Sequence, residues 1–304
     1  IKEKTMKRAV SISIGSSKRD KAVEVKLLGE TVRIERIGTD GDMEKAAQLF
    51  KELDGKVDAF GLGGADLGLL VDNKFYPLQS VKTIVRFVKE TPLVDGSGLK
   101  NTLENRAVPS LHAKTGSYVK EKKALIVSGA DRWGMSVSFV EAGYKCVFGD
   151  LMFGLGIPIP LRSLEALKRL APIAVPIAGR LPFKWVYPTG EKQEKRQPKW
   201  QNYYEWASVI AGDMHYVRRY MPESLPGKVI ITNTTTPADV ELLKKIGIKY
   251  LVTTTPILEG RSFGTNMMEA ALIAASGKGR VLTHAELTEI IDQLNMQPQL
   301  QELT

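Results

Sequence analysis

The regular alternation of short apolar strands with helices in the second half of the chain constrains the fold most. Short apolar runs bounded by turn-forming residues predict strands at 124–127, 145–148, 173–177, 229–232 and 250–253. Helices are predicted at 135–142, 163–170, 199–220, 237–246, 266–275 and 285–294. Strands that alternate with helices form right-handed parallel crossovers. The pattern therefore predicts an α/β fold whose second domain is a Rossmann-like parallel sheet with flanking helices.

The first part of the chain is predicted to form a separate α/β domain. Strands and helices are expected there at 8–14, 23–27, 31–37, 42–53, 57–62, 78–89 and 92–94, the second and third of these forming a hairpin. A polar, basic stretch at 114–123 marks the boundary. We therefore predict a substrate-type domain over 1–118 and a nucleotide-binding domain with C-terminal helices over 119–304. The glutamine-rich segment 296–304 is predicted to fray.

Composition narrows the classes of protein and ligand. The single cysteine, Cys146, excludes an internal disulfide and favours a reduced, cytoplasmic compartment. No apolar run reaches about 18 residues, so no membrane span is expected. The chain has a net charge of +9, and its basic residues are scattered along the sequence. Because nucleic-acid sites show clustered basic stripes, no nucleic-acid partner is expected. The positive field instead favours small anionic or polar substrates. The sequence is also compatible with a homodimer. The three histidines lack the spacing of metal ligands, so no metal is expected.

The clearest ligand-binding motif is the segment Val127–Gly134. It follows an apolar strand and opens a helix, the context in which free N–H groups bind a pyrophosphate. Gly129 and Ala130 would form the tight turn, and Gly134 would let the helix pack close to the strand. Asp150 lies at the end of the next strand, where an acid accepts hydrogen bonds from a ribose. Because a carboxylate repels a 2′-phosphate, the motif favours NAD over NADP.

The motif departs from the dinucleotide pattern at Asp131, which stands where a second glycine belongs. Its charge repels a pyrophosphate, and its Cβ hinders close approach. Arg132 could pair with the phosphate while Asp131 caps the helix. Two alternatives stay open: the ligand is another nucleotide-type molecule such as S-adenosylmethionine, or the turn serves only the fold.

Polar residues follow other predicted strands and form further candidate sites. Asn233 and Thr234 follow the strand at 229–232, at the sheet edge where open α/β sheets bind ligands. We assign them to the cofactor. Arg261 lies between two glycines before a helix that begins with Asn266, and a guanidinium there could clamp a carboxylate or phosphate. We assign this pair to the substrate.

Glycine-rich loops in the first domain carry the candidate catalytic residues. Asp66 follows one predicted strand, and Asp95 with Lys100 follows another. A lysine beside a carboxylate, partly removed from water, can be tuned toward neutral pH and transfer a proton. The alternative is that Lys100 lies on the surface and that the aspartates only form turns.

The order of these features resembles the shikimate and quinate dehydrogenases. Gly129-Ala130 with Gly134 is similar to that family's cofactor turn, and Ile231–Thr235 is similar to its Ile-Asn-Ala-Thr segment. Asn101-Thr102-Leu103 is similar to Asn-Thr-Leu in its substrate domain, whereas its Asn-Thr-Asp triplet and Pro-x-x-Lys context have no match. The resemblance implies a Rossmann-type cofactor domain and an NAD(P)-dependent oxidoreductase acting on a small hydroxy or carboxylate substrate. A non-redox protein, either an S-adenosylmethionine-dependent transferase or a regulatory binding protein, is the alternative.

Overall fold

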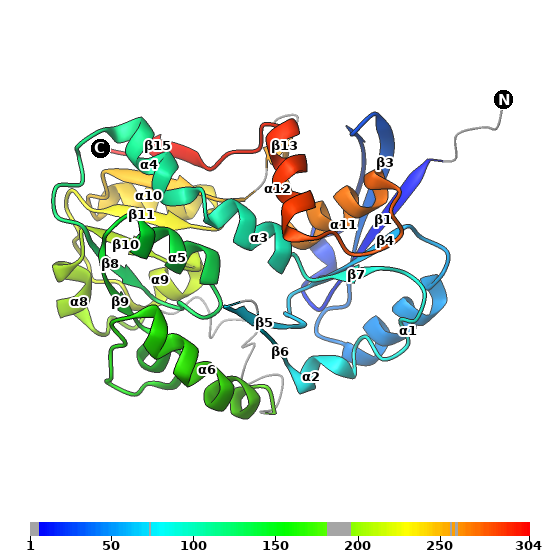
Figure 1. Ribbon diagram of the computed structural model, residues 1–304, viewed down its shortest axis with the longest axis horizontal. Helices are drawn as coiled ribbons and strands as arrows, with labels where there is room; N and C mark the ends of the chain where they lie inside the picture. The colour runs from blue at the N-terminus through cyan, green and yellow to red at the C-terminus, as the bar shows by residue number, and fades with distance from the viewer. Residues whose placement is uncertain (1–5, 73, 181–195, 256, 259–260) are drawn as a thin grey trace.

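Two mainly parallel sheets with helices on their faces form most of the described structure (Figure 1). The computed structural model describes residues 6–72, 74–180, 196–255, 257–258 and 261–304, without the side chains of 178, 257–258 and 261–262. Among the described residues, no helix combines the length and hydropathy that a membrane span requires. The expected α/β class, with a Rossmann-like parallel sheet flanked by helices, is confirmed.

The first sheet contains five strands, and four of them are parallel. The order is β2 (Lys21–Leu27), β3 (Glu30–Gly38), β1 (Lys7–Ser13), β4 (Ala59–Gly63) and β7 (Leu93–Val94). β2 pairs antiparallel with β3, as the predicted hairpin requires. Helix α1 (Met43–Leu53) begins at Asp42, whose side chain accepts the N–H of Lys45. It covers one face of the sheet, where Phe50 meets Phe60 edge-on at 5.1 Å between ring centroids.

The other face of the first sheet is covered by helices from the end of the chain. These are α11 (Thr265–Ser276) and α12 (His284–Gln293), which share a core with β1, β2 and β3. The predicted division assigns both helices to the second domain, whereas here they pack on the first sheet. The physical reason is close packing, because Gly61 of β4 leaves no room for a side chain beside Asn266 at the start of α11.

The second sheet contains six strands, five of them parallel. The order is β15 (Gln299–Glu302), β12 (Tyr250–Thr253), β11 (Val229–Thr232), β10 (Val209–Ala211), β8 (Lys123–Ile126) and β9 (Lys145–Phe148). One face is covered by α4 (Ala107–Thr115), α5 (Trp133–Glu141) and α6 (Leu164–Ala178). The other is covered by α8 (Gln201–Trp206), α9 (Met214–Tyr220) and α10 (Pro237–Lys245). Buried aliphatic residues of the strands thus contact helices on both sides, as a parallel sheet requires.

Shorter elements connect the two sheets. Helix α3 (Ser97–Glu104) lies between them and packs against both α5 and α11 (Figure 1). A hairpin of β5 (Gly68–Val71) and β6 (Lys74–Pro77) leads to α2 (Gln79–Lys82) and packs against α6. The remaining elements are a 3₁₀ turn over Ser17–Arg19, a π-helical turn over Asp150–Gly154, and a small hairpin of β13 (Ile257–Leu258) with β14 (Arg261–Ser262).

Four predicted elements differ from the structure. The predicted strand at 173–177 belongs to α6, because Ala171 and Val175 pack together one turn apart while Ile173 and Ile177 face solvent. The predicted helix at 199–220 contains the buried strand β10 between two short helices. The predicted helix at 78–89 is helical only in α2. The segment expected to fray forms β15, which pairs antiparallel with β12.

Replacing Gly61 with alanine should test the packing that joins the end of the chain to the first sheet. A Cβ there would lie 2.7 Å from the backbone oxygen of Asn266. We expect a loss of about 1–3 kcal/mol in the free energy of unfolding, the usual range for overpacking. Urea denaturation measures it, with Gly154→Ala as the control because a Cβ there meets nothing within 4 Å. Equal stabilities for the two variants would contradict this account.

Candidate functional site

The order of strands in the second sheet creates a topological switch point at β8, and we call the region beyond the carboxyl ends of β8 and β10 the crevice. β9 follows β8 in sequence and lies on one side of it, whereas β10 lies on the other. The loops after β8 and β10 therefore leave the sheet in opposite directions, and open α/β sheets bind ligands at this point. The loop after β8 is the glycine turn, and the loop after β10 ends at Asp213.

Asp150 lies directly on the glycine turn. Its carboxylate accepts the backbone N–H of Gly129 at 2.9 Å and that of Ala130 at 2.8 Å. Burial raises the pKa of Asp150 to about 6, although both hydrogen bonds oppose this shift. Each carboxylate oxygen can still accept another hydrogen bond, because an ionised carboxylate has about four acceptor positions.

Protein atoms, not open space, surround the two motif glycines. A Cβ on Gly129 would lie 2.7 Å from Phe148 and 2.9 Å from Leu167, and one on Gly134 would lie 2.4 Å from the backbone oxygen of Asn101. The side chain of Asn101 also accepts the N–H of Gly134 at 3.3 Å. Gly134 thus permits close helix packing as expected, but the partner is α3 and not the strand.

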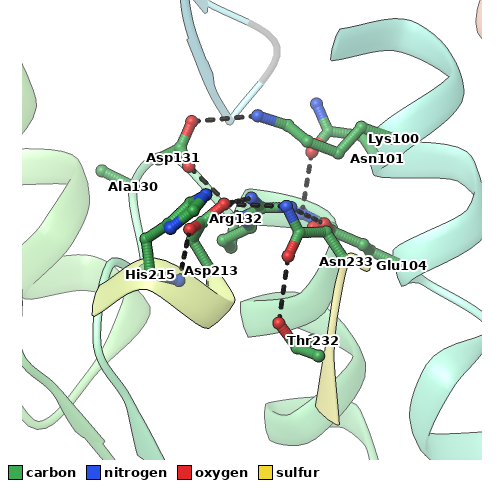
Figure 2. Close-up of polar contacts among 12 residues, drawn as sticks. Lys100, Asn101, Glu104, Ala130, Asp131, Arg132, Asp213, His215, Thr232 and Asn233 are labelled. Atoms are coloured by element: carbon green, nitrogen blue, oxygen red, sulfur yellow. Dashed lines mark hydrogen bonds and ion pairs between the residues drawn. The ribbon is translucent and has the colours of Figure 1, made fainter. Parts of the chain in front are cut away.

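Arg132 is buried in an ion-pair network and does not point to solvent as a phosphate ligand (Figure 2). Its guanidinium contacts Glu104 of α3 at 2.5 Å and Asp213 at 2.8 Å. Burial opposes its charge, but Glu104, Asp131 and Asp213 together raise the pKa of Arg132. The same burial raises the pKa of Glu104 despite its cationic neighbours. Arg132 therefore holds three elements together: α3, the glycine turn and the start of α9.

Asn233 joins this network from the end of β11. Its Nδ2 donates to Asp213 at 2.8 Å, and its Oδ1 accepts the hydroxyl of Thr232 at 3.0 Å. Asp213 also caps α9 by accepting the N–H of His215 at 2.9 Å. Thr234 is exposed. Asn233 thus lies at the crevice as predicted, with its amide fixed in one orientation by its partners.

Lys100 reaches the crevice from α3 and pairs with Asp131 at 2.9 Å (Figure 2). Their side chains are 12% and 28% exposed, so a ligand can reach the pair. Burial lowers the pKa of Lys100, but Asp131 and Asp66 outweigh it and the net shift is upward. Burial likewise opposes ionisation of Asp131, yet Lys100 and Arg132 hold its pKa below the ordinary value. The expected tuning of Lys100 toward neutrality is therefore wrong, since the lysine stays protonated.

The other two predicted catalytic residues hold different positions. Asp66 interacts electrostatically with Lys100. Asp95 accepts the backbone N–H of Ser97 at 2.9 Å and that of Leu67 at 2.6 Å, so it fixes the two loops of the first domain against each other.

Of the two predicted substrate residues, the structure describes the side chain of Asn266 alone. Asn266 donates to the hydroxyl of Ser11 at 2.6 Å and packs beside Gly61 and Gly63, so its amide is used within the first domain. The side chain of Arg261 lies outside the described residues.

The sequence prediction missed Glu104, Asp213 and Glu269. Glu104 lies four residues after Lys100 on a helix, and residues at that spacing share a helix face. The sequence pattern predicts a helix through β10, so it does not identify Asp213 as a residue that follows a strand. Glu269 of α11 accepts the N–H of Leu99 at 3.0 Å and so caps α3. In the described part of the chain, no group of three or more His, Cys, Asp or Glu side chains is arranged to hold a metal ion.

Comparison with known proteins adds family matches and distant structural likenesses. The model for Domain of unknown function (DUF8753) matches residues 8–95, and that for Domain of unknown function (DUF8754) matches residues 98–303. A search of curated proteins finds no match.

Similar solved structures include glutamate dehydrogenase from Thermus thermophilus, at 13% identity and a TM-score of 0.43, covering 95% of this chain and 72% of that chain. A glucose-galactose binding protein from Geobacillus stearothermophilus has 13% identity and a TM-score of 0.37, covering 98% of each chain. NAD-dependent malic enzyme from Thermotoga maritima has 11% identity and a TM-score of 0.35, covering 93% of this chain and 83% of that chain. TM-scores this low support no inference about ligand or reaction.

Glu269 should make the stability of the protein depend on pH. Burial, reinforced by Asp95, raises its pKa from 4.5 to about 7. Because the folded state holds this proton more tightly, the stabilisation is complete below pH 4.5 and is lost as pH rises through about 7. Between pH 5 and pH 8 the free energy of unfolding of the native protein should fall by on the order of 3 kcal/mol more than that of the Glu269→Gln variant. Urea denaturation at both pH values checks this, and parallel pH profiles for the two proteins would refute it.

Proposed function

We propose that this chain, which belongs to the family described as Domain of unknown function (DUF8754), is an oxidoreductase. It would use NAD and act on a small polar substrate between the two sheets. One observation carries the proposal. Asp150, at the end of β9, lies on the glycine turn after β8, beside the Lys100–Asp131 ion pair. The acid proposed to bind ribose and the proposed proton donor thus lie close to the same turn.

The adenosine ribose of NAD fits this arrangement. Asp150 is held by two backbone N–H groups, and its free acceptor positions suit a ribose diol. Its charge disfavours the 2′-phosphate of NADP. The pyrophosphate fits less well, because Asp131 carries a negative charge beside the N-terminus of α5 and Arg132 is used inside the protein. Lys100 offsets the charge of Asp131 through their ion pair.

Lys100 is the proposed proton donor. When bound, the nicotinamide would supply or accept a hydride. In the direction of carbonyl reduction, the carbonyl carbon receives the hydride and its oxygen receives a proton from Nζ of Lys100, which solvent then replaces. Asp131 orients Lys100 and keeps it protonated until that step. Hydride transfer and proton transfer together give the alcohol.

A second candidate ligand is S-adenosylmethionine. The observation that favours it is Asp131, which replaces a glycine at the position closest to a pyrophosphate. S-adenosylmethionine has the same ribose but no pyrophosphate, and its sulfonium is positive. The site would then serve methyl transfer or ligand-dependent regulation instead of redox chemistry.

Thermal denaturation with NAD, NADP, S-adenosylmethionine and adenosine separates the two candidates. A ligand at 100 times its dissociation constant should stabilise the protein by about 2.7 kcal/mol. We expect this from NAD, with a smaller effect from NADP at equal concentration. Stabilisation by S-adenosylmethionine alone would replace the proposal with the second candidate.

Asp150→Asn should weaken NAD binding. Loss of a charge-assisted hydrogen bond costs roughly 1.5–3 kcal/mol, which calorimetry resolves in a variant that still melts cooperatively. In the native protein, NAD affinity should fall as pH drops through about 6, where Asp150 becomes protonated. Glu141→Gln, exposed at the far end of α5, is the matched control. Unchanged affinity in Asp150→Asn would remove this residue from the site.

A further inference from the structure

The side chains around Lys100 carry more negative than positive groups. Ion pairs or electrostatic interactions connect them, and we call this set the Lys100 cluster. Among the described residues it contains six carboxyl groups and two cations: Asp66, Asp95, Glu104, Asp131, Asp213 and Glu269, with Lys100 and Arg132. The protein as a whole has a net charge of +9, whereas carboxyl groups outnumber cations in this cluster.

Both cations of the cluster already have anionic partners. Lys100 pairs with Asp131 at 2.9 Å, and Arg132 pairs with Glu104 at 2.5 Å as well as with Asp213. A substrate carboxylate or phosphate would have to compete with these pairs. Breaking a buried pair leaves one charge uncompensated, which is strongly unfavourable.

A second observation concerns the hydrogen bonds within this cluster. Glu104 is 0% exposed, and its Oε2 has no hydrogen-bond partner. Figure 2 shows this side chain pointing from α3 toward Arg132 and Asn233. A buried carboxylate oxygen without a partner is costly unless a donor reaches it. Glu104 therefore keeps an unused acceptor position beside the ion pairs, and Nε of Arg132 likewise has no hydrogen-bond partner.

We propose that the substrate is an uncharged polyol, or its keto form, and carries neither a carboxylate nor a phosphate. This inference rests on the proposed oxidoreductase function and names its substrate class. Hydroxyl groups donate to the accessible carboxylate of Asp131 and accept from Lys100, so the ion pair binds a polyol without being broken. In reduction of the keto form, the carbonyl carbon gains the hydride from NADH and the oxygen gains the proton of Lys100. The products are the alcohol, NAD and a lysine that solvent reprotonates.

The experiment compares molecules that have similar carbon skeletons and differ in charge. Glucose, glucuronate and glucose 6-phosphate form one set, sorbitol with gluconate a second, and myo-inositol with quinate a third. Binding is measured by calorimetry on the full chain with and without saturating NAD, and turnover by NADH absorbance. We expect a neutral member to bind in at least one set, with its charged counterparts at least about tenfold weaker.

Asp131→Asn adds a signature that a merely structural role for the cluster would not give. Loss of this carboxylate frees the charge of Lys100, so the charged members should gain affinity relative to their neutral counterparts, by about tenfold. Glu289→Gln, an exposed acid on α12, should leave the ratio unchanged. Lys100→Met should abolish the gain when combined with Asp131→Asn.

The outcomes separate this inference from the proposed function. NAD-dependent turnover that prefers an acid or a phosphate would overturn the polyol inference and leave the oxidoreductase proposal intact. Binding of a neutral polyol by a protein that does not bind NAD would overturn the oxidoreductase proposal alone. If no member of the panel binds, the polyol inference is wrong.

Discussion

The buried guanidinium of Arg132 is the interaction on which the arrangement of the crevice depends. It joins α3, which lies between the two sheets, to the glycine turn and to the start of α9 through Glu104, Asp131 and Asp213. An arginine suits this position because its planar group donates in several directions and stays charged when buried. Removing one partner would leave an unpaired charge in the interior, so the three elements are energetically coupled.

Close packing, and not ligand approach, accounts for three glycines near the ends of strands. Gly61, Gly96 and Gly134 each face backbone atoms of a neighbouring helix at distances that exclude a Cβ. Two of these contacts bring α11 onto the first sheet, and the third brings α3 onto α5. A glycine-rich loop after a strand thus has two physical explanations. The missing side chain lets either a neighbouring helix or a bound phosphate approach the backbone closely. Only the partner, which lies far away in sequence, distinguishes them.

The positive charge of the chain and the acidic character of its crevice have different origins. The overall charge is a sum over a solvated surface, and it influences which molecules approach. Affinity at the crevice depends instead on groups removed from water, where Lys100 and Arg132 are already neutralised by acids. A substrate preference inferred from net charge therefore differs from one inferred from the local ion pairs.

The sequence alone determined the α/β class, most of the parallel strands and the placement of Asp150 at the end of β9, because these follow from local apolar periodicity and motif spacing. It also identified Lys100, Asn233 and the turn at Gly129 as residues of interest. Tertiary structure decided the rest. Burial of particular surfaces decides three elements that the local sequence pattern does not predict. These are the strand β10, the helical conformation of 173–177 and the pairing of β15. The partners of Arg132 and the raised pKa of Lys100 likewise depend on acids from distant segments, because electrostatic interaction depends on distance in space and burial, not on separation along the chain.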